Sequence, residues 1–175
     1  MSADKIIVPN LLEWEIQDEY AEFFPYMFGD HRLVGADFAH EIAEISHENT
    51  TKISAKIQDM IDWIFTHQSN IAKEIIAKDY IHLAEKWVTE LGEKVEGLDN
   101  CYLVYERKEA IPIQLPLSKQ VFSNAIEYSS INFIFDKNNQ LDTCIIYVTF
   151  KPDYFSSHAI EVCLDADYTI TVGGL

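Results

Sequence analysis

Hydrophobic and polar positions alternate with different periods along the chain, and the pattern separates an N-terminal, a central and a C-terminal region. Residues 11–24 begin with Leu12, Trp14 and Ile16 separated by polar residues, which predicts a half-buried strand. Residues 33–46 fit both a period of 2 and a period of 3.6. We interpret them as a strand, with a helix as the alternative. The N-terminal region is therefore expected to supply strands.

The strongest periodicity lies in the centre of the chain. Apolar residues recur there at three- and four-residue steps, the spacing of an amphipathic helix: Ile53, Ile57, Met60, Ile64, Ile71, Ile75, Tyr80, Leu83, Trp87 and Leu91. Thr51 is the expected N-cap and Gly92 the expected stop. A single helix of roughly 40 residues is long for a globular protein. We therefore predict two helices or one bent helix, divided at residues 66–70, with Ser69 or Asn70 capping the second.

Residues 93–117 are expected to form a loop with one short strand at 101–105, because two prolines exclude a helix interior there. Ser118 is expected to cap a short helix over 119–126. The side chains expected to face inward from that helix are Val121, Phe122 and Ile126.

The last third of the chain predicts a β-meander, because short apolar runs are separated by turn residues. The predicted strands are 130–135, 143–150, 159–164 and 168–172. Together these elements predict an α+β fold, in which the N-terminal strands and the meander form an antiparallel sheet with the helices packed on one face. One domain over residues 1–175 is expected at this length.

Charge adds a constraint on function. The 175 residues include 29 Asp and Glu against 13 Lys and Arg, a formal net charge of −16. Nucleic acids and anionic membranes are bound by clustered basic residues, so the charge argues against both as partners. It favours a basic partner, a cation, or solubility alone.

The charge is concentrated at the two ends of the chain. Residues 1–50 hold eleven acids and two bases, and residues 127–175 hold seven acids and two bases, whereas the middle is nearly neutral. If the two ends meet in space, they form one anionic face; the alternative is a solvated surface. The candidate interface residues are Glu13, Glu15, Asp18, Glu19 and Glu22.

Motifs for catalysis and cofactor binding are absent from the sequence. No His-Glu-x-x-His, Cys-x-x-Cys, P-loop, Gly-x-Gly-x-x-Gly or Gly-x-Ser-x-Gly motif occurs. We therefore predict no catalytic residue, no metal and no cofactor. Cys101, Cys144 and Cys163 are too few and too widely spaced for a disulfide framework, and the last two are expected in the core. With no signal peptide and no membrane-length apolar run, a cytoplasmic protein is expected.

One local cluster, between two predicted strands, has the residue types of a functional loop. Asp153 and His158 are a carboxylate and an imidazole five residues apart, with Phe155 and hydroxyl side chains between them. Such a loop can bind a cation or perform acid–base chemistry. The alternative is structural: Asp153 caps a turn, His158 satisfies a loop carbonyl, and Phe155 enters the core.

This cluster also carries a family resemblance. Asp153, Phe155, His158 and Ile160 resemble a C-terminal segment shared by a family of small uncharacterised bacterial proteins, in which a glycine often stands where this chain has Ser157. The segments 83–87 and 118–122 are also similar, and the resemblance covers roughly residues 50–175. Relatives occur among immunity-type proteins of toxin systems. The resemblance therefore implies a non-catalytic protein whose acidic surface binds a basic toxin.

Three hypotheses follow. The favoured one is a binding or immunity-type protein that acts through an anionic surface. The second is a small enzyme or metal-binding domain centred on Asp153 and His158. The third is a self-associating structural domain, whose interface would comprise the aromatic residues Trp14, Phe23, Phe24, Tyr26 and Phe28.

Overall fold

The computed structural model describes residues 15–17, 20–23, 33–39, 47–106 and 109–175. In chain order, the elements within them are β1 (Glu15–Gln17), β2 (Tyr20–Phe23), β3 (Leu33–Phe38), α1 (His47–Thr66), α2 (Gln68–Ala77), α3 (Tyr80–Leu91), β4 (Glu93–Lys94), β5 (Cys101–Glu106), β6 (Glu109–Gln114), α4 (Lys119–Asn124), β7 (Ile126–Phe135), β8 (Leu141–Phe150), β9 (Ile160–Asp165) and β10 (Ile170–Val172). The predicted α+β class is confirmed.

Seven strands form the main sheet, in the order β1-β2-β3-β7-β8-β9-β10. The N-terminal strands and the C-terminal meander therefore share one sheet, as predicted. The pairs are antiparallel except for β3 and β7, which run parallel with Leu33 opposite Ser130. A parallel pair needs a long crossover. Here the crossover contains all four helices and a second, smaller sheet.

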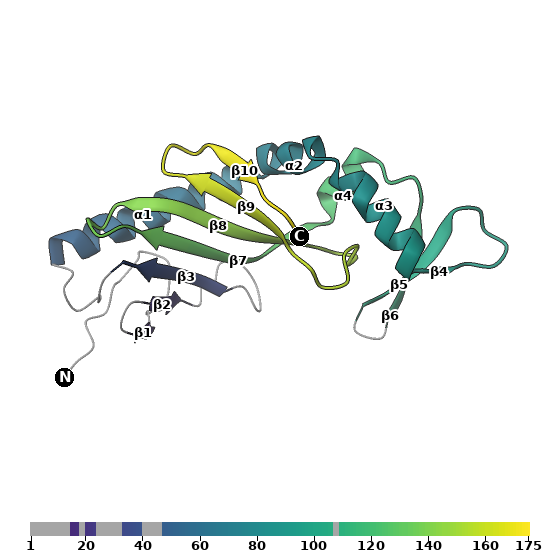
Figure 1. Ribbon diagram of the computed structural model, residues 1–175, viewed down its shortest axis with the longest axis horizontal. Coiled ribbons are helices and arrows are strands. Elements are labelled where there is room, and N and C mark those ends of the chain that lie inside the picture. The colour runs from purple at the N-terminus through teal and green to yellow at the C-terminus, as the bar shows by residue number, and fades with distance from the viewer. Residues whose placement is uncertain (1–14, 18–19, 24–32, 40–46, 107–108) are drawn as a thin grey trace.

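The core lies between the helices and one face of the main sheet (Figure 1). Buried residues alternate along β9 and along most of β7 and β8, where irregular register interrupts the pattern. The buried residues include Phe133, Phe135, Cys144, Ile146, Val148, Ile160, Val162 and Leu164. Helix α1 contributes Ile53, Ile57, Met60, Ile61 and Ile64. It also contacts the β9–β10 turn, because Trp63 stacks on Tyr168 with ring centroids 5.1 Å apart.

The helices differ from the prediction in number and in their ends. The predicted break is present at His67, which precedes α2, so Ser69 and Asn70 are not its cap. A second break at Asp79, which has a φ of 65°, separates α2 from α3. Thr51 lies inside α1, because polar residues fit a first helical turn as well as a preceding loop. No helix among the described residues is long and apolar enough to span a membrane.

Residues 93–117 contain more strand than predicted. The expected strand is present as β5, and it pairs with β4 and β6 in a separate three-stranded sheet. Pro112 lies in β6, at an edge of that sheet, where a missing N–H is tolerated. This sheet, here called the arm, extends beyond the end of the main sheet beside α3 (Figure 1).

The short helix and the meander follow the prediction closely. Ser118 Oγ accepts a hydrogen bond from the N–H of Val121 at 3.2 Å, which confirms the cap of α4. Phe122 is buried, but Val121 is 51% exposed, and Ile126 already belongs to β7. A six-residue helix has room for only one buried side, so the inward orientation predicted for Val121 was wrong.

Candidate functional site

The loop between β8 and β9 holds the predicted residues Asp153, Phe155 and His158. The carboxylate of Asp153 accepts backbone N–H groups from Phe155 at 3.1 Å and from Ser157 at 2.6 Å. These bonds fold the loop back on itself. Asp153 therefore performs the turn-capping task that the structural alternative assigns to it.

The imidazole of His158 is held in the same loop. Its Nδ1 lies 2.9 Å from the carbonyl oxygen of Phe155, and its ring packs edge-on against Trp87 of α3, with centroids 5.3 Å apart. Phe155 is fully buried and contacts Trp87 and Tyr80. Both polar side chains thus have partners inside the loop or on α3, and the loop attaches α3 to the sheet.

The backbone of this loop is strained. Ser156 and Ser157 have φ values of 49° and 68°, in the left-handed region that glycine adopts most easily. The unusual conformation is therefore kept here without glycine, and the two hydrogen bonds to Asp153 stabilise it.

The candidate interface residues are only partly within the described structure. Glu15 of β1 and Glu22 of β2 are direct register partners at the edge of the main sheet. Glu13, Asp18 and Glu19 lie outside the described residues, as do Trp14, Phe24, Tyr26 and Phe28. These two candidate residues therefore belong to the main sheet, as register partners in its edge strands.

The strands of the main sheet carry charge of one sign, whereas the helices carry both signs. Its seven strands contain no lysine, arginine or histidine, and their acidic residues are Glu15, Glu22, Asp37, Glu127, Asp142, Glu161 and Asp165. The basic residues of the described chain lie instead on helices, on the arm and in connections; they are Lys52, Lys56, Lys73, Lys78, Lys86, Lys94, Lys119, Lys137 and Lys151. The two acidic ends of the sequence therefore belong to one sheet, at its opposite edges.

Residues opposite the core give the main sheet a second face of mixed character. Asp37 accepts a hydrogen bond from Asn132 Nδ2 at 2.6 Å, and Tyr147 is 36% exposed. Register places Glu161 beside Tyr147 and Asp165 beside Thr143 on this face. The buried residues of the described helices pack in the core, against the other face of the sheet. The face combines carboxylates with moderately apolar side chains.

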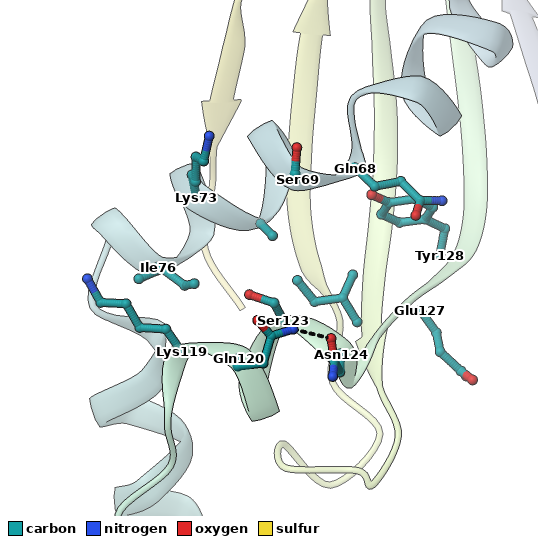
Figure 2. Close-up of a pocket in the computed structure, with 12 residues that line it drawn as sticks. Gln68, Ser69, Lys73, Ile76, Lys119, Gln120, Ser123, Asn124, Glu127 and Tyr128 are labelled. Atoms are coloured by element: carbon teal, nitrogen blue, oxygen red, sulfur yellow. Dashed lines mark hydrogen bonds between the residues drawn. The ribbon is translucent and has the colours of Figure 1, made fainter.

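A separate pocket of about 490 Å³ lies between α2, α4 and the start of β7 (Figure 2). Its polar lining consists mainly of amides and hydroxyls, from Gln68, Ser69, Gln120, Ser123, Asn124 and Tyr128. Gln120 Nε2 donates to Asn124 Oδ1 at 2.7 Å, and Lys73 points away from Lys119 (Figure 2). The lining has neutral hydrogen-bonding groups but no carboxylate–imidazole pair for acid–base chemistry.

The described side chains include no reactive or metal-binding cluster. No group of three or more His, Cys, Asp or Glu side chains among them could hold a metal ion. Cys144 is fully buried, and burial raises its pKa, which suppresses the thiolate. The pKa of Cys163 is also raised by burial, and this residue is half-buried on the opposite face rather than in the core.

Beside the predicted loop is a small cleft that the sequence analysis missed. It has a volume of about 150 Å³, and its lining residues are Trp87, Val88, Leu91, Gly92, Val104, Tyr105, Asp153, Tyr154 and Ser156. Leu91 and Tyr105 are 64% and 59% exposed, although helical periodicity placed Leu91 on the apolar side of its helix. The sequence signal for this cleft is Leu91, an apolar residue at the last position of α3, directly before Gly92.

The comparisons with known proteins found nothing similar. No family model matches the chain, and neither a curated protein nor a solved structure matches it.

Proposed function

We propose that this protein is a non-catalytic binding protein of the immunity type, which captures a basic protein such as a toxin through the anionic strands of its main sheet. The observation that supports the proposal is the single sign of the charge on the strands of the main sheet. Every charged residue within the seven strands is acidic, and the strands come from both acidic ends of the chain.

Such an arrangement acts on a basic partner over a long range. Carboxylates distributed across one sheet add their potentials, which attracts a basic surface and repels acidic competitors. Fields of this kind extend about 8–10 Å at physiological ionic strength and shrink as salt is added. The complex is therefore expected to weaken with rising salt.

The local chemistry of the loop also supports binding over catalysis. The carboxylate of Asp153 is engaged by two backbone N–H groups, and the imidazole of His158 by a carbonyl oxygen and by Trp87. A general acid–base pair needs two groups that are both free to exchange a proton with a substrate. The side chain of His158 is exposed, but the carboxylate of Asp153 is engaged in holding the loop.

The test compares two doubly neutralised variants of the full chain. Glu161→Gln with Asp165→Asn removes two sheet carboxylates. Asp59→Asn with Glu74→Gln removes two exposed carboxylates from helices and changes the net charge equally. Immobilised proteins are incubated with a lysate of the source cells at about 50 mM and about 500 mM salt, and the retained proteins are identified by mass spectrometry.

We expect the wild type and the helix variant to retain a basic protein at low salt, and the sheet variant to retain about fivefold less. That factor corresponds to about 1 kcal/mol for two exposed charges. High salt should release the protein from all three. Retention that is independent of salt, equal losses in both variants, or no basic protein retained would contradict the proposal.

A further inference from the structure

The arm and the end of α3 carry exposed apolar side chains. Leu91, Leu98 and Tyr105 are 64%, 54% and 59% exposed. Single exposed apolar residues are ordinary on protein surfaces, but a group beside a concave site indicates an interaction surface. Leu91 and Tyr105 are such a group, because both line the 150 Å³ cleft.

The cleft has walls from three parts of the chain. Helix α3 supplies Trp87 and Leu91, strand β5 supplies Tyr105, and the loop between β8 and β9 supplies Asp153 and Ser156. We call this site the arm cleft. A cavity of about 150 Å³ can hold one benzene ring, so its size suits a single aromatic side chain.

The wall formed by the loop is held in a fixed shape. Asp153 binds the N–H groups of Phe155 and Ser157, while Phe155 is anchored in the core against Trp87. Ser156, which lines the cleft, has a φ of 49°. Strained backbone of this kind often occurs at binding sites, where the surrounding structure maintains it. A preformed wall lowers the entropic cost of binding.

The charge beside the arm cleft is negative among the residues that the structure describes. Asp153 is part of the lining, and the hydroxyl of Tyr105, another lining residue, donates a hydrogen bond of 2.8 Å to Glu93 Oε2. Within the described part of the chain, no lysine or arginine lines the cleft. An apolar side chain that enters here is therefore favoured when its neighbours are basic.

We propose that the arm cleft accepts one aromatic side chain of the partner, flanked by lysine or arginine. This inference rests on the proposed function and adds an apolar anchor to it. Aromatic residues that fill a desolvated pocket supply much of the affinity of protein complexes, whereas surface charges mainly accelerate and direct association. The sheet and the arm cleft thus have separable roles.

The direct test uses the tripeptide acetyl-Lys-Trp-Lys-amide as a probe, followed by NMR spectra of the ¹⁵N-labelled full chain. We expect saturable shifts of the amides of Leu91, Tyr105 and Ser156. The same tripeptide with Ala in place of Trp should give no saturable shift, and acetyl-Glu-Trp-Glu-amide should bind at least about threefold more weakly because of the surrounding carboxylates.

Two variants and one control complete the test. Leu91→Ala and Tyr105→Ala each should weaken binding of the Lys-Trp-Lys probe at least about fivefold. Val121→Ala truncates an apolar side chain that is also 51% exposed but lies on α4, and it should leave binding unchanged. No saturable shift, shifts centred elsewhere, equal loss in Val121→Ala, or shifts that depend on protein concentration because the chain self-associates would overturn the inference.

The outcome is distinguishable from that of the proposed function. Glu161→Gln with Asp165→Asn should reduce capture of the basic protein but leave the tripeptide bound. If Leu91→Ala and Tyr105→Ala leave capture of that protein unchanged while the sheet variant reduces it, the proposed function stands and the arm cleft is not the anchor. If the cleft binds the probe but no basic protein is captured, the proposed function fails.

Discussion

Asp153 and Ser157 are joined by a hydrogen bond of 2.6 Å from the Ser157 N–H to the Asp153 carboxylate. This bond closes the loop between β8 and β9, which packs against Trp87 of α3. Asp153 also accepts the N–H of Phe155, whose ring is buried against Trp87. The loop that the sequence analysis singled out as a candidate for chemistry therefore has a clear structural role. Removal of the Asp153 carboxylate should have a measurable effect on stability.

Asp153→Ala should lower the free energy of unfolding by about 1.5–3 kcal/mol, because two backbone N–H groups lose a charged acceptor. Asp153→Asn should cost clearly less, since its amide oxygen still accepts one of them. Denaturant titration measures both values. Equal losses in the two variants, or no loss in Asp153→Ala, would show that these bonds do not stabilise the loop.

Ser157→Gly should stabilise the protein by about 0.5–1 kcal/mol, which raises the Tm by about 1–4 °C at this chain length. The native φ of 68° is unfavourable for serine and allowed for glycine, and the relief exceeds the added entropy of the unfolded chain. Ser123→Gly, inside α4, is the matched control and should instead destabilise by up to about 1 kcal/mol. A lower Tm for Ser157→Gly would contradict the prediction.

Gly92→Ala should destabilise the protein by about 1–3 kcal/mol and loosen the arm. An added Cβ would overlap the carbonyl oxygen of Val88, which distorts the end of α3, and would lie 3.1 Å from Cβ of Tyr102, which displaces β5. Gly174→Ala is the control, because nothing lies within 4 Å of its added Cβ. Hydrogen exchange should accelerate in β4 and β5 for Gly92→Ala alone, and unchanged exchange there would contradict the prediction.

Stability should decline in alkaline solution, and Cys144 should account for a defined part of the decline. Burial raises the pKa of its thiol in the folded state, whereas the unfolded thiol ionises near 9.0. The unfolded chain therefore loses this proton first. The contribution to stability is complete below about pH 8 and decreases above about pH 9, by up to about 1.4 kcal/mol per pH unit.

Cys144→Ala should accordingly reduce the slope of unfolding free energy against pH between about pH 9 and 10.5. Val148→Ala, another fully buried truncation in β8, should lower stability without changing that slope. Part of the slope should persist in both variants, because burial also raises the pKa values of Tyr80 and Tyr154. Identical slopes in wild type and Cys144→Ala would contradict the assignment.

Local patterns predicted the meander well. Alternating burial along β7, β8 and β9 follows directly from a period of 2, and the turn between β7 and β8 contains Asn139 with a φ of 59°. The cap at Ser118 and the break near His67 were also predictable, because each depends on neighbouring residues. The pairing of β6 with β5 was not, because the prolines excluded only a helix there, and Pro112 fits a strand only at the edge of a sheet.

The sequence by itself determined the α+β class, the meander, the helical centre and the excess of acidic residues at both ends. The sequence also predicted that the N-terminal strands and the meander share one sheet, but only the tertiary structure decided that β3 and β7 join them as a parallel pair. It also decided that Leu91 and Tyr105 stand exposed beside Asp153. The reason is physical: periodicity reports contacts between near neighbours, whereas strand pairing and cleft formation depend on residues far apart in the chain.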